Sequence, residues 1–87
     1  MKTEELVEKY GRKVLLEVYK GSKGNDCIYY HLKKISKNTE VLIGHAQTVL
    51  DSFLSEGLIV SKLNLDGVGY RINSEKVRGV EKILKGA

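Results

Sequence analysis

The sequence TVLDSFLSEGLI, from Thr48 to Ile59, predicts the end of a helix, a chain reversal and the start of a strand. Its apolar residues recur at the three- and four-residue spacing of one helix face: Val49, Leu50, Phe53 and Leu54. Gly57 then ends the helix, because glycine accepts the left-handed backbone conformation that closes many helices. The next two residues, Leu58-Ile59, are apolar and carry the chain back into the core as a strand.

The residues that follow predict a two-stranded β-hairpin over about residues 58–73. The first strand runs from Leu58 to Leu65 and roughly alternates apolar residues with polar ones: Ile59, Leu63 and Leu65 against Lys62 and Asn64. Asp66-Gly67 predicts a tight turn, since such a turn needs positive φ values that Asp and Gly tolerate. Val68 to Asn73 then returns as the second strand.

One helix is expected after the hairpin and three before it. Ser74 can cap the C-terminal helix, which ends near Gly86 and whose inner side carries Val77, Val80, Ile83 and Leu84. The first helix extends from Glu4 to Lys20, and its apolar stripe is wide enough for two packing partners. Gly11 lies in the middle of this helix and favours a kink or a break there.

The second and third helices form the centre of the predicted domain. Asn25 or Asp26 can cap the second helix, in which one face carries Ile28, Leu32 and Ile35. Ser36 to Thr39 is a short polar connector, and the third helix covers about residues 39–56. Because Val41-Leu42-Ile43 is apolar, either this helix begins near Ile43 after a buried turn or its N-terminal end packs against something. Its solvent side carries Gly44, His45, Gln47, Thr48, Asp51 and Ser52.

The composition indicates a single domain over residues 1–87. The chain is 41% hydrophobic and 30% charged and lacks Trp and Pro, which is typical of a soluble globular protein. Its length excludes a two-domain enzyme, and no apolar run approaches the roughly 20 residues of a membrane span. The N-terminal residues lead into amphipathic sequence and not into a signal peptide, so a cytoplasmic protein without membrane contact is expected.

The charge is basic and unevenly distributed. The net charge of +4 and the pI near 9.2 permit a nucleic acid as partner. Residues 20–39 contain five lysines against Asp26 alone, whereas residues 40–56 contain acidic residues and no Lys or Arg. Basic charge is therefore concentrated before the third helix and absent within it.

The predicted order of elements resembles the winged helix-turn-helix superfamily. TVLDSFLSEGLI resembles the exit of its recognition helix, where apolar residues at helical spacing lead to a Gly-Leu-Ile that enters the wing. GYRINSEKVRGVEKIL, from Gly69 to Leu84, is similar to the second wing strand and the following helix of MarR-like and PadR-like transcription regulators. The resemblance covers about residues 12–84. It implies an α+β fold with three helices, a two-stranded wing and a C-terminal helix.

The resemblance also implies a transcriptional regulator that binds double-stranded DNA sequence-specifically. The third helix would enter the major groove, where its N-terminal half points to base contacts by Gly44, His45, Gln47 and Thr48. Phosphate contacts are expected beside the connector, from Lys33, Lys34, Lys37 and Asn38, and on the wing, from Lys62, Asn64 and Arg71. The alternative interpretations are a merely solvated helix face, a lysine run that only serves solubility, and an Arg71 whose stem covers a hydrophobic edge.

The sequence also supports expectations about the oligomeric state, other partners and catalytic or metal sites. The wide apolar stripe of the first helix and the apolar C-terminal helix predict a homodimer through these two helices, because such end elements pair in many of the regulators that the chain resembles. The alternative to DNA binding is a protein-interaction module of a larger complex, favoured by a recognition helix without Lys or Arg. No enzyme, cofactor or metal site is expected. Cys27 and His31 are four residues apart, but two ligands do not make a zinc site, and a phosphate-binding glycine loop is missing.

Overall fold

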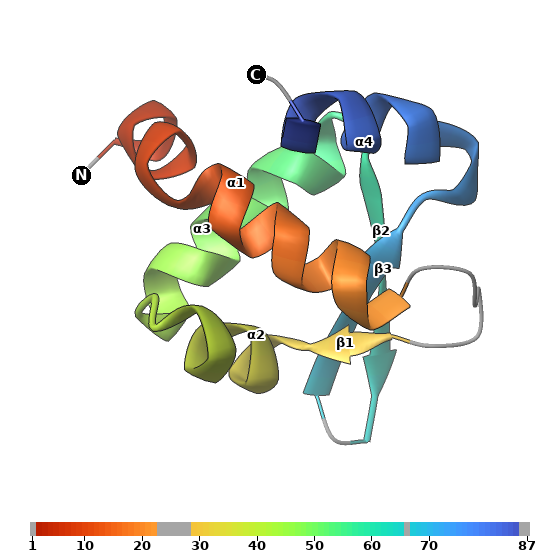
Figure 1. Cartoon of the computed structure of the whole chain (residues 1–87). Helices are drawn as coiled ribbons and strands as arrows, with labels where there is room; N and C mark the ends of the chain where they lie inside the picture. The colour runs from red at the N-terminus through yellow and green to blue at the C-terminus, as the bar shows by residue number, and fades with distance from the viewer. Residues whose placement is uncertain (1, 23–28, 66, 86–87) are drawn as a thin grey trace.

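The computed structural model describes residues 2–22, 29–65 and 67–85 as an α+β arrangement of helices packed against an antiparallel sheet (Figure 1). The described elements, in chain order, are α1 (Thr3–Ser22), β1 (Tyr30–His31), α2 (Leu32–Thr39), α3 (Ile43–Ser55), β2 (Ile59–Asn64), β3 (Gly67–Ile72), the 3-10 turn η1 (Ser74–Lys76) and α4 (Val77–Lys85). The free end of the β2–β3 hairpin and helix α4 lie at opposite ends of the molecule in Figure 1. Within the described residues, no helix is both long enough and apolar enough to cross a membrane.

Helix α1 runs without interruption through Gly11, so the predicted break into two shorter helices was wrong. Gly11 is buried, and a Cβ atom added there would lie 3.2 Å from Cγ1 of Val7 and 3.3 Å from Cζ of Phe53. The glycine therefore allows Phe53 of α3 to pack closely on α1. Helix α1 also packs against α2, α4 and β3, which exceeds the two partners that its apolar stripe predicted.

The sheet has three strands in the order β1-β3-β2, which corrects the prediction of a two-stranded hairpin alone. Strand β1 is antiparallel to β3, with Tyr30 opposite Tyr70 and His31 opposite Gly69. The prediction failed because Ile28, Leu32 and Ile35 have the spacing of a helix face over a short stretch of sequence. The aromatic residues Tyr29 and Tyr30, in contrast, favour a strand. Helix α2 consequently begins at Leu32, and the predicted caps Asn25 and Asp26, with Ile28, lie outside the described residues.

The connection between α2 and α3 also differs from the prediction. Ser36 to Thr39 belong to α2 and are not a connector, and α2 ends at Thr39, followed by the C-cap Glu40, whose φ of 60° is left-handed. The hydroxyl of buried Thr39 donates a hydrogen bond to the carbonyl oxygen of Ile35 at 2.6 Å. Val41 is buried and α3 begins at Ile43, not at residue 39. Of the two alternatives for the apolar Val41-Leu42-Ile43, the helix start at Ile43 is therefore correct, but of the two residues before it only Val41 is buried, and Leu42 is exposed.

The hairpin register places the turn one residue earlier than predicted. Asn64 is opposite Gly67, so Gly67, with a φ of 120°, opens β3 and is not the second turn residue. Leu65 lies in the turn, while Asp66 is outside the described residues. Only the first residue of β2, Ile59, is buried, because the distal half of the hairpin extends beyond the helices. Leu63 and Leu65 are consequently exposed and do not contribute to the core as the alternation suggested.

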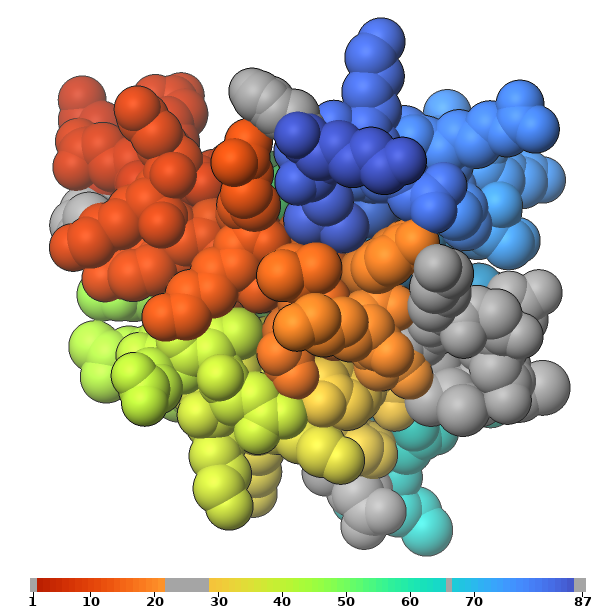
Figure 2. Space-filling model, in the orientation of Figure 1, coloured from red at the N-terminus to blue at the C-terminus, as the bar shows by residue number. Residues whose placement is uncertain are grey.

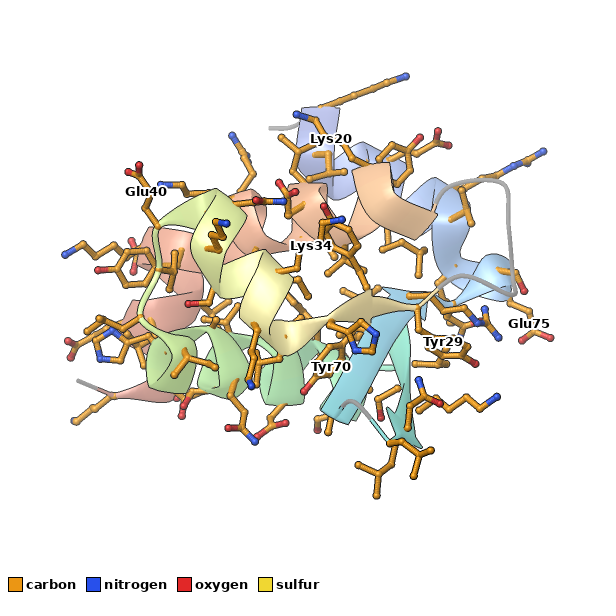
Figure 3. All side chains as sticks on the ribbon, turned by 90° about the horizontal axis from the view of Figure 1, so that it is seen from below. Lys20, Tyr29, Lys34, Glu40, Tyr70 and Glu75 are labelled. Carbon is orange, nitrogen blue, oxygen red and sulfur yellow. The ribbon has the colours of Figure 1, made fainter. Side chains whose placement is uncertain are left out.

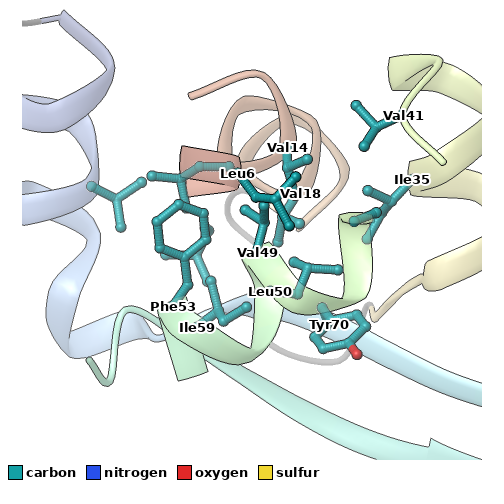
Figure 4. Packing of buried hydrophobic residues seen from close by; sticks show 14 residues of the cluster. Leu6, Val14, Val18, Ile35, Val41, Val49, Leu50, Phe53, Ile59 and Tyr70 are labelled. Carbon is teal, nitrogen blue, oxygen red and sulfur yellow. The ribbon is translucent and has the colours of Figure 1, made fainter. Parts of the chain in front are cut away.

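The core lies between α1, α3 and the sheet (Figure 4). The predicted inner residues of the third helix that are fully buried are Ala46, Val49, Leu50 and Phe53, which confirms that face. In α4, Val80 is buried but Ile83 is 42% exposed, so the predicted inner side is only partly packed. The cap also differs, because Asn73 and not Ser74 accepts a hydrogen bond from the backbone N–H of Glu75.

Candidate nucleic-acid interface

Helix α3 presents a polar ridge, which we define as Gly44, Gln47, Thr48 and Asp51. These residues are spaced at i, i+3, i+4 and i+7 and therefore share one face of the helix. Gly44, Gln47 and Asp51 are exposed, whereas Thr48 is half-buried and donates its hydroxyl to the carbonyl oxygen of Gly44 at 3.0 Å. The ridge thus offers a protruding helix surface with one side-chain amide, one hydroxyl oxygen and one carboxylate.

His45 lies apart from this ridge. Its ring is stacked against that of Tyr10 in α1, with a centroid separation of 6.0 Å and an interplanar angle of 21°. The structure therefore brings together three of the four predicted base-contact residues and turns His45 toward α1. Asp51 also belongs to the ridge, although it was not among the predicted base contacts. It lies four residues after Gln47, a spacing that already placed both residues on the same helix face.

Asp51 also influences the residue behind the ridge. Tyr70 of β3 is buried between α3 and the strands (Figure 3). Burial of its hydroxyl raises the pKa of Tyr70 above the ordinary tyrosine value, and the negative charge of Asp51 raises it further. Tyr70 therefore remains neutral at physiological pH, and the stability that this neutral form contributes is lost only as the pH rises through the raised pKa.

The lysines predicted to contact phosphate lie on α2 beside the ridge. Lys33, Lys34 and Lys37 are exposed, and α2 packs directly against α3. The ammonium of Lys34 lies 5.3 Å from the centre of the Tyr30 ring, a distance at which cation–π attraction is effective. Lys33 borders a hollow of about 140 Å³ between α2, α3 and β3, lined also by His31, Leu32, Ile43, Gly67 and Val68.

Asn38 is committed to contacts within the protein. Its side-chain nitrogen donates hydrogen bonds to Oε1 of Glu17 and to the hydroxyl of Tyr30, both at 3.0 Å. The Tyr30 hydroxyl in turn donates to the same Glu17 oxygen at 3.0 Å. Burial and the hydrogen bond and charge of Glu17 raise the pKa of Tyr30, while the hydrogen bond from Asn38 lowers it. This Glu17–Tyr30–Asn38 triangle joins α1, β1 and α2.

The predicted wing residues lie on the face of the sheet away from the core. Gly69, opposite Lys62, lies under Tyr29, because a Cβ added to it would come within 2.6 Å of the Tyr29 Cβ. The Lys62 ammonium and the Arg71 guanidinium lie 5.8 and 5.4 Å from the centre of the Tyr29 ring. Arg71 is half-buried and also donates to the carbonyl oxygen of Ile72 at 3.2 Å, whereas Lys62 and Asn64 are exposed. Arg71 thus fits the alternative of a stem that covers part of the sheet.

Exposed apolar side chains flank the ridge. Leu42 and Ile43 at the start of α3 are 71% and 46% exposed, and Leu63 and Leu65 at the hairpin end are 79% and 107% exposed. The exposure of the two leucines did not follow from the alternation of apolar and polar residues along the strand. The apolar turn before α3 was visible in the sequence, but its exposure was not.

The described residues do not contain a group of three or more His, Cys, Asp or Glu side chains that could hold a metal ion. Cys27 lies outside the described residues, and His31 belongs to β1 and not to a helix. No protein-family model matches the chain, and neither does a curated protein or a solved structure. The surface chemistry around α3 is accordingly the basis on which a function can be proposed.

Proposed function

We propose that the protein is a winged helix-turn-helix domain that binds double-stranded DNA and regulates transcription. The layout of α1, α2, α3, the hairpin and α4 is compatible with a winged helix, with β2–β3 as the wing. The observation that carries the proposal is the exposed polar ridge of α3, together with the exposed lysines of α2, the helix that packs against α3. A protruding helix with a neighbouring cationic surface is the shape and charge that a major groove and its phosphates accept.

Within this proposal the residues have separate roles. Gln47 is the base-reading side chain, because an amide can donate to and accept from the edge of adenine at the same time. Gly44 allows close approach of the helix to the duplex, and Thr48 offers its remaining oxygen lone pairs. Lys33, Lys34 and Lys37 of α2 and Lys62 of the hairpin bind phosphate and set the position of the helix without reading sequence. His45 and Asn38 stabilise the protein's own structure in this assignment.

Substitution of Gln47 and of Lys33 should separate these roles. Starting from the tightest duplex obtained by selection from a random pool, Gln47→Ala is expected to reduce the preference for that duplex over unrelated DNA by about 5- to 150-fold. Lys33→Ala should weaken binding to all duplexes alike, and Lys82→Ala on α4 is the matched lysine control that should change neither. Fluorescence anisotropy measures all three, and equal sequence-blind losses from Gln47→Ala and Lys33→Ala would contradict the assignment.

A second candidate function is a protein-interaction module. It is favoured by the exposed apolar side chains of Leu42 and Ile43 at the start of α3 and of Leu63 and Leu65 at the hairpin end. An apolar interface would have an affinity that changes little with salt, whereas phosphate contacts make DNA affinity strongly salt-dependent. The salt dependence of binding therefore distinguishes the two candidates.

The proposed regulator acts as a homodimer. Figure 2 shows that α1 and α4 adjoin across one face of the molecule. Leu16 of α1 and Ile83 of α4 are 37% and 42% exposed. A hollow of about 150 Å³ between the two helices is lined by Leu16, Tyr19, Glu81, Leu84 and Lys85. Pairing of two copies through α1 and α4 would cover this apolar surface and leave both hairpins at the outer ends, suited to half-sites about one DNA turn apart.

A charge placed in this surface should prevent pairing. Leu16→Glu is expected to give a 9.8 kDa species in sedimentation equilibrium at micromolar concentration, while the unchanged chain sediments at twice that mass. Lys37→Glu, which lies on α2 away from this surface, is the control and should remain dimeric. A 9.8 kDa species for the unchanged chain at these concentrations would refute the dimer.

A further inference from the structure

The accessible surface at the start of α3 combines one amide with apolar groups. Ile43 lies one helical turn before Gln47, so the two side chains are neighbours along the helix. Ile43 is 46% exposed and also lines the hollow shared with Leu32 and Val68, which extends the apolar surface toward the hairpin. Leu42, immediately before the helix, is 71% exposed. An amide and an isoleucine side chain are thus presented together at the N-terminal end of the ridge.

The helix offers no side chain suited to guanine. In the major groove, guanine presents two acceptors, which are bound by Arg or Lys, and α3 contains neither residue. The carboxylate of Asp51 only accepts hydrogen bonds, so the acceptor edge of guanine would repel it, and within a G·C pair only the amino group of cytosine could donate to it. Adenine presents an acceptor beside an amino donor, which a glutamine amide matches, and thymine presents a methyl group, which an apolar side chain matches.

We propose that the ridge selects A·T base pairs, with the Gln47 amide hydrogen-bonded to adenine and Ile43 packed against a thymine methyl group. The target class is a duplex that is rich in A·T pairs where α3 enters the major groove. This inference rests on the proposed function and deepens it, because it states which chemical groups of the duplex are read and by which side chains.

Removal of single methyl groups from the DNA tests this assignment without altering base pairing. Thymines of the selected duplex are replaced one at a time by deoxyuridine, which lacks only the C5 methyl group. At one or two positions the affinity of the unchanged chain is expected to fall about fourfold, the factor that accompanies loss of one buried methyl-sized group. Ile43→Ala should bind the thymine and uracil duplexes equally at that position, whereas Ile43→Val should retain part of the preference.

Ile83→Ala is the matched control, because Ile83 is 42% exposed, close to the exposure of Ile43, but lies on α4. This variant should keep the full ratio between thymine and uracil duplexes, even if its overall affinity changes. Thermal melting checks that the Ile43 variants remain folded. Two results would overturn the A·T assignment but leave DNA binding intact. One is salt-dependent duplex binding that no deoxyuridine replacement changes, and the other is a selected site rich in G·C pairs. Failure to bind any duplex would overturn the proposed function itself.

Discussion

The affinity for duplex DNA is expected to fall about a thousandfold when the salt concentration rises from 50 to 200 mM. Each phosphate that a lysine neutralises releases condensed counterions, so the logarithm of the affinity falls with the logarithm of salt by about 0.9 per contact. The exposed lysines of α2 and Lys62 of the hairpin supply most of the roughly six contacts that this loss requires in each bound unit. Anisotropy titrations of a labelled duplex at five or more salt concentrations measure the slope.

Double Lys→Gln substitutions identify which lysines produce this dependence on salt. Lys33→Gln combined with Lys37→Gln should reduce the magnitude of the slope by about 2 for each bound copy of the chain, since each copy loses two phosphate contacts. Lys76→Gln combined with Lys82→Gln removes the same charge from η1 and α4, away from the hairpin tip, and should leave the slope nearly unchanged (Figure 1). A slope near zero for the unchanged chain would contradict DNA binding and favour the protein-interaction module.

Leu50→Ala is expected to lower the free energy of unfolding by about 2–5 kcal/mol. Leu50 is 0% exposed in the centre of the core, so its truncation removes buried apolar contacts and leaves a cavity that neighbouring side chains fill only in part. A loss of this size is a large fraction of the roughly 5–15 kcal/mol that stabilises a typical domain. Urea denaturation followed by circular dichroism measures the difference.

Leu42→Ala is the control for this stability experiment. Leu42 is the same residue type at the start of the same helix, but it is 71% exposed. Its truncation should change the free energy of unfolding by no more than about 0.5 kcal/mol. Similar losses in the two variants, or a loss below about 1 kcal/mol for Leu50→Ala, would contradict the packing of α3 through its Ala46–Phe53 face.

Features determined by local sequence were largely predictable. The inner face of α3 followed from its three- and four-residue spacing, and the end of the helix followed from Gly57, whose φ is 77°. The approximate limits of the hairpin and of the final helix followed from alternation and turn residues. These predictions succeeded because periodicity and glycine conformation act over a few residues.

Features determined by tertiary contacts were not predictable from the sequence. Tyr30 and His31 form a strand only because β3 offers an unpaired edge to them. The stacking of His45 on Tyr10 and the hydrogen bonds of Asn38 to Glu17 join residues far apart in the chain. The single-residue shift of the hairpin turn arises from the register of all its pairs. Side chains assigned to DNA from their spacing were therefore used by the protein itself.

The Glu17–Tyr30–Asn38 triangle has a mechanical consequence. Its 3.0 Å hydrogen bonds fasten the outer side of α2 to α1, in addition to the apolar packing on the inner side of α2. Because α2 is short and held on two sides, we expect it to move together with α1 as one rigid unit. A tilt of α1 imposed by a second copy would therefore also move the lysines of α2. It would change the distance between the phosphate contacts made by the two copies.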